Sequence, residues 1–238
     1  MKKVIIVGAT SGIGRELAKL YAADGCEVGI AGRRTELLAS LASELPTKSY
    51  QLALDIAEPE KAMNSLSQLI EEMQDVDLII ISSGTGFING SLDWAPEKET
   101  IATNVMGFAA VANVAMNYFL KRKKGHLAGI SSIAAIRGGH EGPAYNASKA
   151  FVSNYLEGLR VKAAKMKVPV TVTDIQPGLV DTAMAKGEGL FWVAPVPKAA
   201  KQIYQAIAKR KAKAYVTRRW ALIALLLKLL PDWLYQKI

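Results

Sequence analysis

The chain has 238 residues, of which 50% are hydrophobic and only 21% are charged, and this composition excludes an intrinsically disordered chain. Its 30 Lys and Arg outnumber its 21 Asp and Glu, but residues 1–197 carry twenty of each kind, so the net charge of +9 lies entirely in residues 198–238. A single cysteine, Cys26, excludes an internal disulfide and, with only two histidines, predicts no metal site. We therefore expect a protein of a reducing compartment, the cytoplasm.

Short apolar runs, many of them β-branched, alternate with helical patterns along the chain. The predicted strands are 4–7, 28–31, 50–54, 78–81, 127–130, 170–175 and 214–217, and the predicted helices are 12–24, 35–45, 58–73, 96–120, 145–165 and 198–211. Strands separated by helices pair in parallel, because parallel neighbours need long crossover connections. The sequence therefore predicts one α/β domain over residues 1–217, a doubly wound, Rossmann-type parallel sheet of about seven strands with helices on both faces.

A glycine-rich turn joins the first predicted strand to the first helix. Its glycines are spaced G-x-x-x-G-x-G, and the turn consists of Gly8, Thr10, Ser11, Gly12, Ile13 and Gly14 together with Ala9. Glycines allow a ligand to approach the backbone closely, and a helix N-terminus offers free N–H groups and a partial positive charge to a pyrophosphate. The pattern favours a dinucleotide site, with a turn that serves packing alone as the alternative.

The ends of the second and third strands indicate which dinucleotide binds. A carboxylate after the second strand would bind the 2'-hydroxyl of NAD, but the chain has Arg33 and Arg34 there. Arginine suits a 2'-phosphate because its planar fork binds phosphate oxygens in pairs. We therefore predict NADP(H) rather than NAD(H), unless both arginines are merely solvated. Asp55 and Ile56, which end the third strand, are expected beside the adenine ring.

Residues 101–120 contain no charge and precede four basic residues, as a membrane-spanning helix would. However, this stretch contains Asn104, Asn113 and Asn117 and is rich in alanine rather than leucine. Polar amides are costly in lipid, so a helix buried in the protein or at a subunit interface is the better prediction.

Tyr145 and Lys149 are four residues apart on a predicted helix, so their side chains share one face. Reduction of a ketone needs a proton for the new alkoxide, and a phenol with a pKa near ~10 must be shifted by a few units to work at neutral pH. A nearby ammonium stabilises a phenolate and lowers its pKa. The pair favours acid/base catalysis; an amphipathic helix with a surface Tyr and Lys is the alternative.

Taken together, the glycine turn, Asn104, Ser132, the Tyr145–Lys149 pair and Pro177–Gly178 resemble the short-chain dehydrogenase/reductase (SDR) family over residues 1–217. The resemblance implies that Tyr145 is the general acid in reduction and the base in oxidation, and that Lys149 also binds the nicotinamide ribose. It implies that Ser132, thirteen residues before Tyr145, bonds the substrate carbonyl, with Ser131 as its near rival. Asn104 would anchor a water relay to Lys149.

The resemblance also extends to two loops. The segment with Pro177, Gly178, Val180 and Thr182 would close over the nicotinamide, with the Val180 backbone and the Thr182 hydroxyl at its carboxamide. A plain strand-ending turn is the alternative. After the fourth strand the chain departs from the family's usual Asn-Asn-Ala-Gly and has Ile81-Ser82-Ser83-Gly84. Gly84 still permits close approach to the adenosine ribose, and Ser83 still offers local hydrogen bonds.

The expected substrate pocket is apolar. Met184, Leu190, Phe191 and Trp192 are interleaved with Gly187 and Gly189, as in a mobile covering loop. Leu92, Trp94, Ile136 and His140 are candidates for the other side. This composition favours a hydrophobic carbonyl substrate.

Residues 218–238 form a basic, leucine-rich extension that we expect to be an apolar helix ending at Pro231. Its longest uncharged run, residues 220–227, is far shorter than the ~20 residues that span a bilayer. One helical face collects Leu222, Leu225, Leu226, Leu229 and Trp233. Three alternatives follow: packing on its own or a partner subunit, lying in a membrane interface with Arg218, Arg219 and Lys228 near anionic lipid, and nucleic-acid contact, which the leucines disfavour.

The combined pattern predicts an NADPH-dependent oxidoreductase that reduces a hydrophobic ketone or aldehyde, or oxidises the matching secondary alcohol. A catalytically silent cofactor-binding regulator or membrane scaffold is the alternative, which the intact Ser132, Tyr145 and Lys149 disfavour. A methyltransferase would share the fold type but leaves the Tyr145–Lys149 pair unexplained. The uncharged 96–120 helix and the Tyr145 helix have the composition of subunit interfaces, and the resemblance implies a homodimer or homotetramer.

Overall fold

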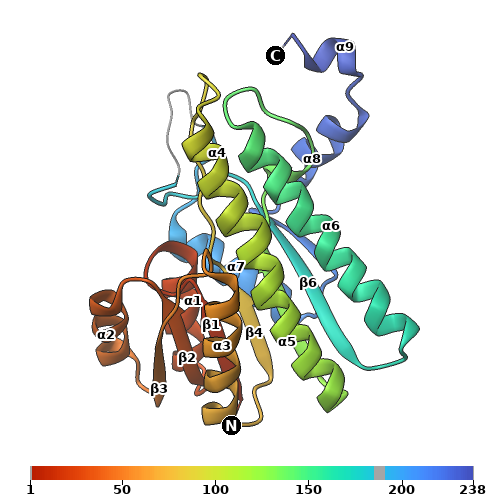
Figure 1. Ribbon diagram of the computed structural model, residues 1–238. Helices are drawn as coiled ribbons and strands as arrows, with labels where there is room; N and C mark the ends of the chain where they lie inside the picture. Colours follow the sequence, from red (N-terminus) through yellow and green to blue (C-terminus); the bar gives the residue numbers. More distant parts are fainter. Residues whose placement is uncertain (1, 185–190, 238) are drawn as a thin grey trace.

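A single parallel sheet organises the molecule in the computed structural model, which describes residues 2–184 and 191–237 (Figure 1). Its seven strands lie in the order β3-β2-β1-β4-β5-β6-β7. They are β1 (Lys3–Val7), β2 (Glu27–Gly32), β3 (Ser49–Ala53), β4 (Leu78–Ile81), β5 (Gly125–Ile130), β6 (Val170–Pro177) and β7 (Lys213–Val216). Every neighbouring pair is parallel, so the predicted doubly wound sheet is confirmed.

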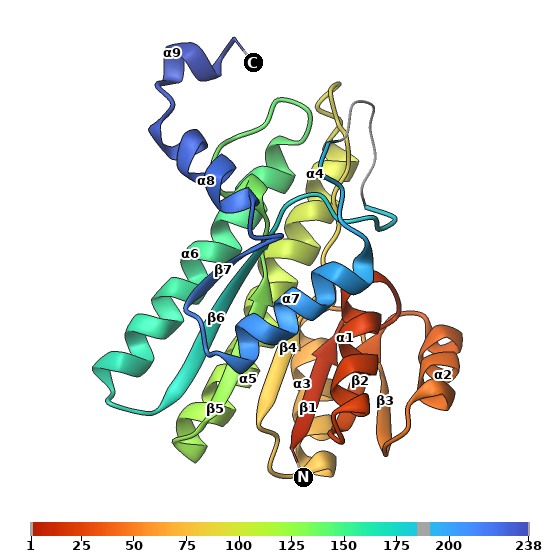
Figure 2. The same cartoon turned by 180° about the vertical axis from the view of Figure 1, so that it is seen from behind.

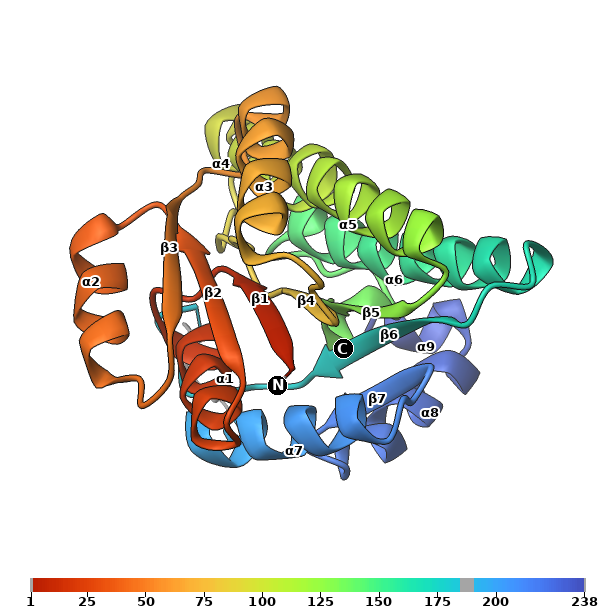
Figure 3. The same cartoon turned by 90° about the horizontal axis from the view of Figure 1, so that it is seen from below.

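Helices cover both faces of the sheet, as the view along the strands shows (Figure 3). One face packs against α1 (Gly12–Ala23), α2 (Thr35–Glu44) and α7 (Val196–Ala208). The other packs against α3 (Pro59–Met73), α5 (Phe108–Arg122) and α6 (Pro143–Lys165). Because both faces are covered, the inner strands are apolar: every residue of β4 is buried, and only the first residues of β1 and β2 are partly accessible. The edge strands β3 and β7 have exposed residues.

The helix predicted over residues 96–120 is interrupted near its start. It begins as α4 (Trp94–Ile101), widens into the π-helical turn η1 (Ala102–Gly107) and continues as α5. A π turn inserts an extra residue into the helical ladder and recurs at functional sites. Here it contains Asn104, one of the predicted catalytic residues, and the helix lies against the protein core rather than spanning a bilayer.

The predicted C-terminal extension is helical and is broken at Pro231. It comprises α8 (Trp220–Leu229) and the short α9 (Asp232–Tyr235), which lie at one end of the molecule beyond β7 (Figure 2). Among the residues that the structure describes, no helix combines the length and the apolar character needed to cross a membrane.

The strand order reverses between β1 and the central strand β4. In doubly wound sheets, ligands bind in the crevice beyond the carboxyl ends of the strands at such a reversal. The turns after β1, β4, β5 and β6 meet at this edge, which is the upper end of the molecule in Figures 1 and 2. The fold therefore brings the predicted site residues to one edge of the sheet.

Candidate active site

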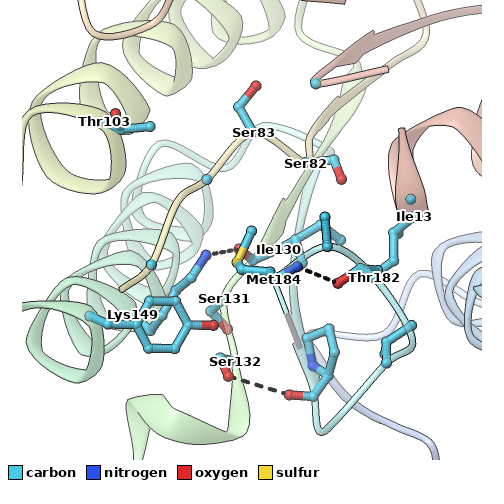
Figure 4. A pocket seen from close by; sticks show the side chains of 18 of the residues that line it. Ile13, Ser82, Ser83, Thr103, Ile130, Ser131, Ser132, Lys149, Thr182 and Met184 are labelled. Atoms are coloured by element: carbon cyan, nitrogen blue, oxygen red, sulfur yellow. Dashed lines mark hydrogen bonds between the residues drawn. The ribbon is translucent and has the colours of Figure 1, made fainter. Parts of the chain in front are cut away.

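A cavity of about 500 Å³ opens at this edge, within the size range of small-molecule sites (Figure 4). Its wall includes all of the predicted catalytic and cofactor residues except Gly14 and Asn104. These are Gly8, Thr10, Ser11, Gly12, Ile13, Arg33, Arg34, Asp55, Ile56, Ser83, Gly84, Ser132, Tyr145, Lys149, Pro177, Gly178, Val180 and Thr182. The phosphate turn and the tyrosine–lysine pair, far apart in sequence, therefore share one cavity.

The glycine turn has the geometry that a pyrophosphate needs. Gly8 has a φ of +92°, and a Cβ at this position would stand 2.5 Å from the Ser83 backbone nitrogen, so only glycine fits between β1 and the loop after β4. Ser11 occupies the N-cap of α1, but its side chain makes no capping hydrogen bond there. The first N–H groups of α1 thus keep their capacity for an anion, and the residues present fit a dinucleotide.

The two arginines after β2 have different surroundings. The Arg34 guanidinium donates to the Thr10 hydroxyl at 2.7 Å and to the Ser11 hydroxyl at 2.8 Å, so it closes one side of the phosphate turn. The Arg33 side chain is 63% exposed at the cavity and pairs with Asp55 at 3.8 Å. Arg34 is therefore held at the glycine turn, whereas Arg33 stands at the rim with a weak partner.

Lys149 is buried beneath the cavity, where it donates to the Ile130 carbonyl at 3.2 Å (Figure 4). Burial lowers the pKa of Lys149 to about 8, and the carboxylate of Asp174 acts in the opposite direction. Its Nζ lies 5.7 Å from the centre of the Tyr145 ring, so the predicted pair is together in space. Burial raises the pKa of Tyr145, and the facing Ser132 hydroxyl opposes that shift. The pKa of Tyr145 in the protein alone is therefore raised, and not lowered by Lys149 as we expected.

The structure distinguishes the two adjacent serines. Ser131 donates to the Asp174 carboxylate at 2.5 Å and is thereby committed to the core. Ser132 caps the short 3-10 turn η2 (Ile133–Ala135) by accepting from the Ala134 N–H at 3.1 Å, and its remaining donor makes only a long 3.5 Å contact with the Pro177 carbonyl. Ser132 therefore keeps a hydroxyl proton available at the cavity, in line with the predicted choice.

Asn104 lies behind the cavity wall instead of in it. Its amide donates to the Thr85 carbonyl at 2.7 Å and to the Ser148 hydroxyl at 2.9 Å, and its oxygen accepts from the Thr85 N–H at 2.9 Å. These bonds brace the loop after β4 against α6. Gly84 passes between Asn104 and Lys149, since a Cβ there would be 3.1 Å from Nζ and 3.3 Å from Oδ1.

Two residues that the sequence patterns did not predict, Asp174 and Trp220, support the walls of the site. Asp174, fully buried in β6, accepts from Ser131, from Ser153 at 2.7 Å and from Gln176 at 2.9 Å. An acidic residue within a strand predicted to be buried is unusual, and this could have singled out Asp174 from the sequence. Trp220, at the start of α8, fills the space beside Gly178, where any Cβ would collide with its indole. Its ring packs against Phe191 and Trp192 at centroid distances of 5.4 and 6.1 Å.

The predicted substrate residues are only partly at the cavity. Met184 lines it. From the segment between β4 and α4, Phe87 and Ile88 line the cavity, whereas the predicted Leu92 and Trp94 are exposed to solvent. Ile136 and His140 line a separate groove beneath α9. Gly187, Gly189 and Leu190 lie outside the described residues.

Comparison with known proteins agrees with this geometry. A family model described as short chain dehydrogenase matches residues 2–190. An uncharacterized oxidoreductase of Myxococcus xanthus (strain DK1622) is 35% identical over 188 residues, which covers 77% of this chain and 74% of the relative. A second uncharacterized oxidoreductase, from Mycobacterium tuberculosis (strain ATCC 25618 / H37Rv), is 31% identical over 249 residues and covers 99% of this chain and 96% of its own length.

Solved structures share the fold at low sequence identity. A short-chain dehydrogenase from Sphingobium yanoikuyae in complex with NADPH superposes with a TM-score of 0.81 at 20% identity, covering 98% of this chain and 97% of that one. A 7beta-hydroxysteroid dehydrogenase gives a TM-score of 0.81 at 22% identity over 96% and 92% of the two chains. The chain therefore belongs to the short-chain dehydrogenase family and is an oxidoreductase of that family.

Proposed function

We propose that the protein is an NADPH-dependent reductase that converts a hydrophobic ketone or aldehyde to the alcohol, or oxidises the matching secondary alcohol. The observation that carries the proposal is the shared cavity: Ser132, Tyr145 and Lys149 form one part of its wall and the glycine turn forms another. A silent regulatory or scaffold protein would have no need to keep a proton donor, a carbonyl-binding hydroxyl and a buried cation around one space.

Each of the three side chains has a distinct task in this proposal. When bound, the nicotinamide supplies or accepts the hydride. The Ser132 hydroxyl holds the substrate oxygen. The Tyr145 hydroxyl gives that oxygen a proton during reduction, and the Tyr145 phenolate removes a proton from the alcohol during oxidation. The Tyr145 phenolate that results forms next to the Lys149 ammonium, whose pKa of about 8 leaves it mostly charged at neutral pH. That charge offsets the burial that disfavours a phenolate.

The matched test of this role is Tyr145→Phe against Tyr155→Phe, a tyrosine on the same helix that is absent from the cavity wall. We expect Tyr145→Phe to lower kcat by about 10³-fold and Tyr155→Phe to leave it within about twofold. Both are measured by NADPH consumption with a panel of ketones and aldehydes. Unchanged turnover in Tyr145→Phe would defeat the mechanism, and no turnover by the native chain on any carbonyl would favour the silent alternative.

The cofactor preference rests on Arg33 and Arg34. The exposed Arg33 fork is the better candidate for an added 2'-phosphate, because Arg34 already donates to Thr10 and Ser11. We expect Arg33→Ala to raise the KM for NADPH about tenfold while that for NADH changes less than twofold. Equal effects on both cofactors would refute the preference for NADPH.

The substrate class rests on Phe87, Ile88 and Met184, three apolar residues of the wall that also contains the catalytic side chains. Apolar side chains favour a hydrophobic carbonyl compound, because they contribute binding free energy by removing its surface from water. A comparison of kcat/KM between aliphatic or cyclic ketones and small hydroxy acids or sugars tests the class. Faster turnover of the small polar compounds would contradict it.

We also expect a homodimer or homotetramer built on the outer faces of α5 and α6, and a cytoplasmic setting in which the buried Cys26 thiol stays reduced. On α6, Phe151 and Tyr155 stack with ring centroids 5.5 Å apart and are only partly buried. Sedimentation equilibrium of the purified protein measures the assembly. A monomer at micromolar concentration would overturn the oligomer prediction.

A further inference from the structure

The C-terminal extension exposes five large apolar side chains to solvent. We call this group the tail face, and it consists of Leu222, Leu225, Leu226 and Leu229 of α8 with Trp233 of α9. Each of these side chains is between 56% and 71% exposed. Large apolar side chains gathered on one side of a helix mark an interaction surface far more often than single exposed leucines do.

The tail face is the outer side of a helix whose inner side is already packed. Trp220 and Ala224 are buried, and helical spacing places them opposite the leucines. The extension is also tied to the catalytic domain, because Arg137 pairs with Asp232 at 2.6 Å and the Tyr235 hydroxyl donates to the Gly138 carbonyl at 2.5 Å. The tail face is thus held outward by contacts on its other side.

The segment that carries the tail face is positively charged. Arg218, Lys228 and Lys237 are exposed on the same segment. The only carboxylate side chain in residues 198–237 is Asp232, and Arg137 already pairs with it. Two copies packed through this face would bring two sets of cations into one interface, which costs free energy. An anionic surface complements the same charges.

The tail face lies at the end of the molecule that holds the active-site cavity. α8 and α9 extend past the carboxyl ends of β6 and β7, at the same end of the molecule as the start of α4 (Figures 1 and 2). Two further side chains are exposed near the start of α4: Leu92, which precedes the helix, at 64%, and Trp94, its first residue, at 67%. The tail face, Leu92 and Trp94 therefore expose apolar side chains at the same end of the molecule as the cavity.

We infer that the tail face docks the protein on an anionic phospholipid bilayer, with the leucines and Trp233 at the headgroup–acyl boundary and the cations among the headgroups. Basic residues beside leucine and tryptophan are the composition of helices that lie in the membrane interface. α8 has ten residues, far too few to span the hydrocarbon core, so the contact is peripheral. Docking involves no turnover, and its test is independent of the proposed reaction.

The experiment is flotation of the full-length protein with vesicles of phosphatidylcholine alone or with about 30% phosphatidylglycerol. We expect binding to the anionic vesicles, much weaker binding to pure phosphatidylcholine, and a loss of binding at high salt. Leu225→Gln with Leu229→Gln should lower the partition coefficient about a hundredfold, roughly tenfold for each leucine. Val161→Gln with Met166→Gln, at the far end of α6 and similarly exposed at 50% and 51%, should leave it unchanged.

The charges are tested separately. Arg218→Gln with Lys228→Gln should weaken binding to the anionic vesicles about 25-fold, about fivefold for each cation. The matched control is Lys162→Gln with Lys165→Gln, two exposed lysines of α6. Because every substituted side chain is exposed, circular dichroism should show native folding in all four variants.

Three outcomes overturn the inference. The first is a native chain that does not float with anionic vesicles. The second is a Leu225→Gln, Leu229→Gln variant that binds as the native chain does. The third is a native oligomer that fails to bind vesicles and dissociates in this variant, as light scattering would measure, because the tail face would then contact a second copy of the chain.

Discussion

Buried polar side chains lie at both ends of the sheet, and the two groups differ in what remains for a ligand. At the amino end, the His126 ring and the Thr173 hydroxyl are 2.8 Å apart, and Thr173 donates onward to the Lys211 carbonyl at 2.6 Å. At the carboxyl end, Lys149 has three N–H donors but makes one hydrogen bond within the described residues. Polar groups bonded to protein stabilise the fold, whereas those with unused donors are available for chemistry.

The largest expected effect tests the carboxyl end. Lys149→Met removes the buried ammonium, and we expect kcat/KM for carbonyl reduction to fall about 10³-fold because the phenolate loses its counter-charge. The melting temperature should stay the same or rise, since burial of this cation is unfavourable and lowers its pKa to about 8. Differential scanning calorimetry checks the second part. A clearly lower melting temperature would show that Lys149 stabilises the fold, and the two ends of the sheet would then not differ in this respect.

The next largest effect concerns the apolar packing beside the site, which Trp220 provides. Trp220 is 4% exposed and Trp233 is 64% exposed, so the same substitution probes a buried and an open position of one extension. We expect Trp220→Ala to lower the free energy of unfolding by about 3 to 5 kcal/mol and Trp233→Ala by less than about 0.5 kcal/mol. Urea denaturation measures both. Similar values for the two would mean that Trp220 contributes little to the core.

A pH experiment tests the amino end. Burial lowers the pKa of His126 from 6.5 to about 4, so between these values the unfolded chain binds more protons than the folded one. Stability is therefore fully present above pH 6.5 and is lost as the pH falls towards 4, by about 2 to 3 kcal/mol at pH 4.5. Between pH 6.5 and pH 4.5, the free energy of unfolding of His126→Gln should therefore fall by about 2 to 3 kcal/mol less than that of the native chain, as urea denaturation would measure. Parallel pH curves would show that His126 does not titrate as inferred.

The smallest effect concerns the link between the buried acid and the catalytic lysine. Asp174 opposes the lowering of the Lys149 pKa, so Asp174→Asn should lower that pKa further. The alkaline limb of the kcat/KM profile for reduction should then move to lower pH by up to about one unit, with little change at pH 6. The exposed Asp93→Asn is the control. A uniform loss of activity without a shifted limb would assign Asp174 a packing role only.

Sequence alone selected polar residues that share one cavity, because their signals are local. Tyr145 and Lys149 are one helical turn apart, and the glycine turn follows directly on a strand, so each pattern can be recognised without a tertiary structure. The alternation of strands and helices predicted the sheet for the same reason. The spacing to Tyr145 also favoured Ser132 over Ser131, and the hydrogen bond of Ser131 to Asp174 supplies the physical reason.

The parts that the sequence did not predict depend on contacts between distant segments. Trp220 meets Gly178 only because β7 returns the chain to the edge of the sheet beside β6. Phe87 and Ile88, not Leu92 and Trp94, face the cavity because Asn104 holds the loop after β4 through Thr85. The π turn that contains Asn104 has no composition signal, since its residues suit an ordinary α-helix equally well.

The contact between Trp220 and Gly178 has a consequence for how this chain can vary over evolutionary time. A side chain at position 178 is excluded as long as the indole occupies that space, and a smaller residue at position 220 would leave a void unless position 178 grew. The two substitutions are therefore non-additive, and each changes the fitness effect of the other. Among descendants of this sequence, positions 178 and 220 should therefore change together or not at all.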